Sequence, residues 1–156
     1  SISSYLSYLK DAYLLSTADR YDIHGKKLLE SNEKLYFGDI GIRNLIAGGE
    51  REGDIEKIVE NIVFQQLLRM GYTVNVGQLR AGEVDFVCTK SNERIYVQAA
   101  YLIASKETEN REFGSLENIQ DNYPKYVISM TPFVRRSDRQ GIIHLGLREF
   151  LKHGFH

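Results

Sequence analysis

The sequence predicts an α/β domain in which helices flank a mixed β-sheet, preceded by a smaller helix and hairpin. The first observation is an order of helix, three strands, helix and strand, read from hydrophobic periodicity over residues 54–130. The second is the nearly continuous apolar run at 126–130, as expected of a strand buried on both faces. The third is a pair of strand-like stretches, 83–89 and 94–101, joined by a short polar turn.

Composition excludes several classes of protein. The chain has 156 residues and a net charge of −1, so a nucleic-acid role needs a local basic patch rather than a general positive field. Cys88 is the only cysteine, which rules out an internal disulfide and indicates a reducing, cytoplasmic compartment. No apolar run approaches the roughly 18 residues that span a bilayer, so no membrane partner is expected. A start at Ser1 without methionine indicates a fragment of a longer protein.

The first part of the chain has the pattern of a helix followed by a hairpin. Apolar residues recur at helical spacing over 1–15, and 18–37 contains two extended stretches around a turn at 24–25. This is the order at the end of a winged helix, although a hairpin simply packed on the main domain fits equally well. In a wing, Lys26 and Lys27 would lie at the tip, where they could contact phosphates.

The N-terminal helix also predicts an exposed apolar patch. We expect this patch around Tyr5, Leu9 and Tyr13, where it would allow the chain to form a homo-oligomer. Asp39 can begin a short connecting helix, and the polar, glycine-rich stretch 48–53 then suggests a boundary. The expected units are 1–48, a winged-helix remnant with its connecting helix, and 49–156, the main domain.

The helix expected at 54–70 carries the strongest amphipathic pattern. Its apolar stripe is expected to pack on the sheet and comprises Ile55, Val59, Ile62, Val63 and Leu67. Glu60 lies beside this stripe. Its carboxylate either sits at a solvated rim or reaches toward a site.

The strands at 83–89 and 94–101 place polar residues on neighbouring strands. Simple alternation puts Glu83 and Asp85 on one face and Val84 and Phe86 on the other, with Gln98 on the adjacent strand. Carboxylate oxygens in such an arrangement could bind Mg²⁺. The alternative is that both carboxylates only mark the solvated face of the sheet.

The remaining elements complete the sheet and add a second basic stretch. A helix capped by Ser105 is expected over about 107–121, then a strand at 125–130, a strand at 141–145 and a helix at 147–152. The intervening charged loop at 131–140 supplies further candidate nucleic-acid contacts, which are Arg135, Arg136 and Arg139.

Five stretches together resemble one protein family. They are IVENIVF at 58–64, GEVDFV at 82–87, IYVQAAY at 95–101, TENREFG at 108–114 and DNYPKYVIS at 121–129. In this order they look like the C-terminal domain of unknown function of archaeal-type AAA+ family ATPases. The resemblance covers residues 1 to about 151. It implies a PD-(D/E)XK, or restriction-endonuclease-like, fold preceded by part of a winged helix.

The resemblance also implies a degenerate nuclease site. Glu60 and Asp85 match the two metal-binding carboxylates, but the E-x-K triplet of active members falls on Gln98, Ala99 and Ala100. The chain therefore lacks the third carboxylate and the lysine that assists the attacking water.

The implied role is a non-catalytic accessory domain without a firm cofactor. It would bind DNA or a protein partner, including the ATPase domain of its own full-length protein. The alternative is a Mg²⁺-dependent DNA nuclease whose lysine comes from elsewhere, with Lys90, Lys106 and Lys125 as candidates.

Overall fold

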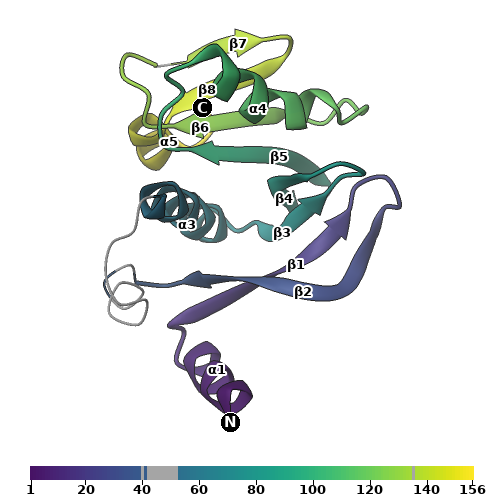
Figure 1. The fold of residues 1–156 in the computed structure, drawn as a ribbon, viewed down its shortest axis with the longest axis vertical. Coiled ribbons are helices and arrows are strands. Elements are labelled where there is room, and N and C mark those ends of the chain that lie inside the picture. Colours follow the sequence, from purple (N-terminus) through teal and green to yellow (C-terminus); the bar gives the residue numbers. More distant parts are fainter. Residues whose placement is uncertain (40, 42–52, 135) are drawn as a thin grey trace.

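One continuous mixed sheet organises the chain. The structure is a computed structural model and describes residues 1–39, 41, 53–134 and 136–156. Among these residues, eight strands form the sheet in the order β2-β1-β3-β4-β5-β6-β8-β7 (Figure 1). The predicted α/β class, a mixed sheet flanked by helices, is confirmed.

The central part of the sheet follows the predicted order. Helix α3 (Asp54–Arg69) leads into an antiparallel meander of β3 (Thr73–Gln78), β4 (Glu83–Lys90) and β5 (Glu93–Ala100). Helix α4 (Lys106–Glu117) then crosses over, and β6 (Lys125–Ser129) pairs in parallel with β5. Ser105 caps α4 as expected, because its side chain accepts a hydrogen bond from the Thr108 N–H.

The N-terminal hairpin extends this same sheet. Strands β1 (Leu15–Asp22) and β2 (Lys27–Phe37) pair with each other, and β1 also pairs in parallel with β3. The expected wing is therefore hydrogen-bonded to the main sheet rather than forming a separate one. The proposed boundary at 48–53 and the connecting helix lie almost entirely outside the described residues.

Helix α1 (Ile2–Asp11) projects from the rest of the molecule at the N-terminus (Figure 1). None of its residues is buried. Tyr5 is exposed as predicted, and Tyr13, just beyond the helix, is 88% exposed, whereas Leu9 is half-buried.

The C-terminal edge contains one strand that the sequence did not predict. Strand β8 (Ile142–Gly146) pairs in parallel with β6, and helix α5 (Leu147–His153) follows it. The expected loop at 131–140 includes β7 (Arg136–Arg139), which pairs with β8. Its sequence, RSDR, has no apolar alternation because it is a short, largely exposed edge strand.

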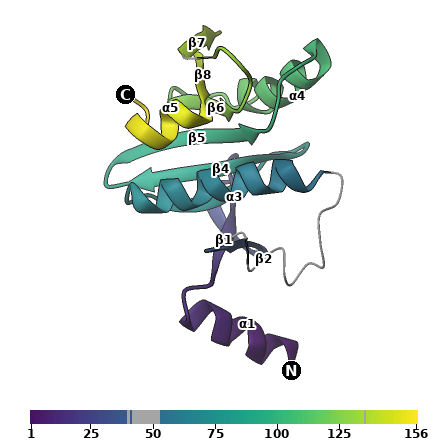
Figure 2. The ribbon, with the colours of Figure 1, turned by 90° about the vertical axis from the view of Figure 1, so that its left-hand side faces the viewer.

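Two apolar layers cover the two faces of the sheet. On one face, α3 and α5 pack against Phe86, Val97 and Ile128, and Figure 2 shows both helices on the same side. On the other face, α4 packs through Phe113 and Leu116. Alternate side chains of the central strands thus enter different layers, which explains the nearly continuous apolar run in β6.

The buried face of α3 differs in part from the prediction. Val59, Val63 and Leu67 are buried as expected, but Ile55 is 44% exposed. Phe64 is buried instead, and its ring stacks on Tyr36 of β2. Because residues four apart lie on the same helix face, Phe64 brings Glu60 into the packed stripe.

Candidate functional site

The site forms where β4 and β5 separate. Their regular pairing ends at Phe86 and Val97, and beyond that point side chains supply the hydrogen bonds. The N–H of Asp85 donates to Gln98 Oε1 at 3.0 Å, and the N–H of Ala99 donates to Asp85 Oδ2 at 2.9 Å. Asp85 and Gln98 are therefore neighbours, as predicted. Their side chains connect β4 and β5 beyond the last backbone pair.

A bulge in β4 corrects the predicted side-chain alternation. Asn75 pairs with Val87 but Gly77 pairs with Val84, so β4 contains one more residue than β3 in this interval. Val84 consequently packs in the α4 layer and Phe86 in the α3 layer, rather than on one shared face. The Asp85 carboxylate reaches the end of β5, where it accepts from the Ala99 N–H.

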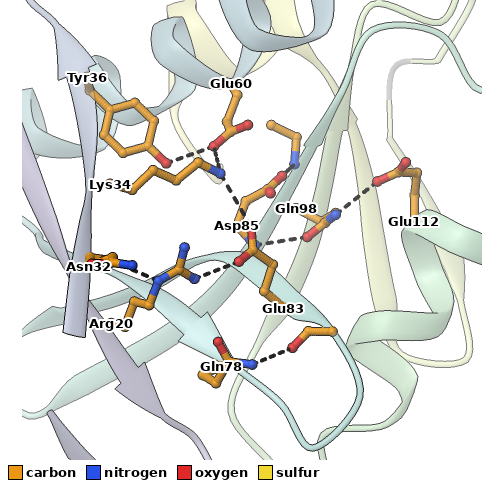
Figure 3. Close-up of polar contacts among 12 residues, drawn as sticks. Arg20, Asn32, Lys34, Tyr36, Glu60, Gln78, Glu83, Asp85, Gln98 and Glu112 are labelled. Atoms are coloured by element: carbon orange, nitrogen blue, oxygen red, sulfur yellow. Dashed lines mark hydrogen bonds and ion pairs between the residues drawn. The ribbon is translucent and has the colours of Figure 1, made fainter. Parts of the chain in front are cut away.

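Strand β2 contributes a lysine and a tyrosine that contact Glu60. Lys34 Nζ lies 2.6 Å from Glu60 Oε1, and the hydroxyl of Tyr36 donates to the same oxygen at 2.7 Å (Figure 3). The Glu60 side chain is only 16% exposed. It therefore lies inside the site and not at the solvated rim that its helix position also allowed.

Lys34 also interacts with the carboxylates of β4. Its Nζ lies 3.5 Å from Glu83 Oε1, and Glu83 Oε2 is 2.7 Å from Arg20 Nη1. Burial raises the pKa of Glu83, but the hydrogen bond from Arg20 and the charge of Lys34 outweigh it and hold that pKa below its usual value.

The surroundings of the site favour the charged form of Lys34 and the protonated form of Asp85. Burial of Lys34 lowers its pKa, but the neighbouring charges of Glu60, Asp85 and Glu83 outweigh burial and raise that pKa overall. For Asp85, burial and then the charge of Glu60 raise the pKa well above its usual value. The Lys34 ammonium and the Arg20 guanidinium thus balance the carboxylates at the site.

Gln98 is matched to a second acidic residue on α4. Its Nε2 donates to Glu112 Oε2 at 2.9 Å, while Arg111 pairs with the other Glu112 oxygen at 2.9 Å. A glutamate at position 98 could not donate this hydrogen bond and would face the buried Glu112 carboxylate. The amide at 98 is therefore the side chain that this neighbourhood requires.

The three lysines considered as displaced amines are bound elsewhere. Lys90 donates to Met70 O, Lys106 pairs with Glu109, and Lys125 pairs with Asp121. The amine at the site is Lys34, which the sequence analysis did not single out. The available signal was the spacing of Lys34 and Tyr36, which places both on one face of an extended strand.

The cations predicted to bind nucleic acid are dispersed. Lys26 lies in the β1–β2 turn and Lys27 begins β2, and both are exposed. Arg136 donates to Phe155 O at 3.0 Å. Arg139 pairs with Glu109 and Glu117 of α4 at 2.7 and 3.1 Å, so it fastens β7 to that helix. Arg135 lies outside the described residues.

The carboxylates of this arrangement do not fit a Mg²⁺ ion. Glu60 already accepts from Lys34 and Tyr36, and Asp85 accepts from the Ala99 N–H. Within the described part of the chain, no group of three or more His, Cys, Asp and Glu side chains has a geometry that could hold a metal. The Lys34 ammonium supplies positive charge beside these carboxylates.

The chain is similar to a protein of which it spans only part. An uncharacterized protein from Haemophilus influenzae is 42% identical over 129 residues, which is 83% of this chain and 31% of that protein. The chain therefore spans about a third of the length of this relative. No protein-family model and no solved structure matches the chain. In the described residues, no helix is long and apolar enough to cross a membrane.

Proposed function

We propose that this chain is a non-catalytic, restriction-endonuclease-like accessory domain of a larger AAA+ family ATPase, which binds nucleic acid or a protein partner. The observation that carries the non-catalytic role is the 2.6 Å ion pair between Lys34 and Glu60. In this proposal the lysine is an internal counter-ion that replaces the metal of active nucleases. It stabilises the acidic site without enabling the site to activate water.

The architecture supports the fold assignment within this proposal. Helix α3, the meander β3-β4-β5, helix α4 and the parallel strand β6 follow the element order of the restriction-endonuclease-like core. In this assignment Glu60 on α3 and Asp85 on β4 would correspond to its carboxylates. The length of the Haemophilus influenzae relative supports a longer parent protein.

The hydrogen bonds support a structural rather than catalytic use of the site. Asp85 and Gln98 join β4 to β5 where backbone pairing has ended. Ala100, at the position of the catalytic lysine, is 3% exposed and carries no amine. Glu60 Oε1 and Asp85 Oδ2 accept from protein donors, and position 100 supplies no amine, which supports a site that does not activate water.

The second candidate function is a metal-dependent DNA nuclease, and one observation favours it. Lys34 brings an amine into contact with Glu60, so a lysine is present although position 100 lacks one. In that case Lys34 would be required for cleavage, whereas in our proposal it only stabilises the fold.

A plasmid-nicking assay separates the two functions. We expect no nicking of supercoiled DNA by the wild-type chain with Mg²⁺ or Mn²⁺. Asp85→Ala and Lys34→Met are the matched variants, and a contaminating nuclease would persist in both. Nicking by the wild type that disappears in both folded variants would refute the non-catalytic proposal.

A further inference from the structure

An aromatic cleft lies away from the acidic site, between the β4–β5 turn and the C-terminal residues. Its volume is about 580 Å³. Its lining includes three tyrosines, a phenylalanine, a lysine and an arginine, which are Tyr72, Tyr123, Tyr126, Phe155, Lys90 and Arg94. The acidic site uses none of these side chains.

The rings and cations of this cleft are interleaved. The Lys90 Nζ lies 5.6 Å from the centre of the Tyr72 ring, and the Arg94 guanidinium lies 5.5 Å from that of Tyr123. Arg94 also lies 4.8 Å from the Tyr21 ring, which continues the row beyond the cleft. Tyr123 is 44% exposed, so part of its side chain is open to a ligand.

The cations are held in place by the protein. Lys90 donates one N–H to Met70 O and so is fixed at the rim. Burial lowers the pKa of Arg94, but hydrogen bonds to the hydroxyls of Tyr21 and Tyr96 outweigh burial and raise it. Among the described residues that line the cleft, Glu93 is the carboxylate that opposes these two cations.

We propose that this cleft binds unpaired nucleotides of a single-stranded nucleic acid. A base would stack on Tyr123 and Tyr72, and its phosphates would lie against Lys90 and Arg94. The inference rests on the binding role proposed above, and it specifies the partner and the surface.

The chemistry favours a single strand over a duplex. Aromatic rings alternating with cations suit a base and its phosphate together, because a base has a flat apolar face and the phosphate a negative charge. In a duplex the base faces are covered by neighbouring bases, so the exposed ring of Tyr123 would have no partner. The overall charge of −1 likewise opposes general duplex binding and requires a local site.

Fluorescence anisotropy with a labelled oligothymidylate of about 15 nucleotides tests the proposal. We expect Tyr123→Ala to weaken binding about tenfold or more and Tyr123→Phe to retain it, because only the ring is needed. Glu93→Gln should tighten binding. Phe133→Ala removes a fully exposed aromatic side chain outside the cleft and is the control that should bind as the wild type does.

Two further probes identify what is recognised. An abasic strand with the same backbone should bind about tenfold more weakly than oligothymidylate if stacking supplies the affinity. With two phosphate contacts, the logarithm of the binding constant should fall with that of salt concentration with a slope of about −1.4. If free thymidine monophosphate competes as strongly as the unlabelled oligonucleotide, the cleft is a site for single nucleotides. That result would overturn the proposal that it binds a nucleic-acid strand.

Equal binding of oligothymidylate by the wild type and Tyr123→Ala, or equal binding of the abasic strand, would overturn the proposal. This result differs from the one that would refute the non-catalytic role. The non-catalytic role is refuted if the chain cleaves DNA and cleavage requires Asp85 and Lys34, neither of which lines the cleft.

Discussion

Replacing Lys34 by methionine tests its role as the internal counter-ion. Methionine keeps much of the length of the side chain but removes the charge. Glu60 would then keep only the hydroxyl of Tyr36 as donor, in a position where its side chain is 16% exposed. Removing one partner of a fully buried ion pair costs about 3–5 kcal/mol.

The Lys34 side chain is 29% exposed, so solvent reduces this cost. We expect Lys34→Met to lower the free energy of unfolding by about 2–3 kcal/mol. For a chain of this length, that loss lowers the melting temperature by about 4–12 °C. Thermal unfolding followed by circular dichroism measures the change directly.

A second substitution distinguishes loss of charge balance from loss of packing. Adding Glu60→Gln to Lys34→Met should restore much of the stability, because the amide oxygen still accepts from Tyr36 without carrying a charge. In Lys34→Met alone, Mn²⁺ should raise the melting temperature, since Glu60 and Asp85 lose the cation they share. A Lys34→Met variant that melts as the wild type does would refute the counter-ion role.

Three further predictions concern Asp85, the register of α3 and the surface of α1. The folded pKa of Asp85 is raised above its unfolded value of 3.8, so its contribution to stability decreases as pH rises from that value through the folded pKa. Asp85→Asn keeps an acceptor for the Ala99 N–H and should reduce the change of urea-unfolding free energy with pH. If that change is the same as in the wild type, Asp85 is not its source. In α3, Leu67→Ala should cost about 2–5 kcal/mol and the exposed Ile55→Ala less than about 0.5 kcal/mol, and equal melting temperatures would show that the register is wrong. The exposed tyrosines of α1 should make the chain self-associate, and light scattering should show that Tyr5→Ser with Tyr8→Ser shifts it toward monomer; a wild type that stays monomeric at high concentration would exclude this.

The order of elements from α3 to β6 could be predicted because its signals are local. The amphipathic period of α3 and the apolar run of β6 each lie within one element, and the turn at 91–92 separates β4 from β5 clearly. The proximity of Asp85 and Gln98 follows from the adjacency of these two strands. The bulge in β4 could not be predicted, since it arises from unequal pairing with β3 rather than from the alternation within β4.

The role of Lys34 could not be predicted for a different reason. Side chains of a strand alternate, so on β2 Lys34 shares a face with Tyr36, and Leu35 lies on the opposite face. In the structure Leu35 is 40% exposed, and Lys34 points to Glu60. On this face the carboxylates of Glu60 and Glu83 lie near the ammonium group of Lys34. The spacing of Lys34 and Tyr36 therefore indicates a shared face of β2, but their partner Glu60 comes from an element distant in sequence and no local pattern identifies it.

Restoring a glutamate at position 98 provides a final test of how the site is balanced. Gln98→Glu supplies the carboxylate that the family resemblance implies, but its oxygens would face Glu112 Oε2, which lies 2.9 Å from the present amide nitrogen. The Glu112 side chain is only 8% exposed, so the two carboxylates would repel each other strongly or share a proton.

We expect Gln98→Glu to lose about 1–3 kcal/mol of stability at neutral pH, because a hydrogen bond is lost and a buried acceptor left without its donor. Much of this loss should disappear in the double variant with Glu112→Gln, which restores one donor and one acceptor. Urea unfolding of the three proteins at neutral pH measures these differences. If Gln98→Glu is as stable as the wild type at neutral pH, then the amide at 98 is not required by Glu112. The glutamine at position 98 would in that case be a replacement for the carboxylate that the fold tolerates but does not require.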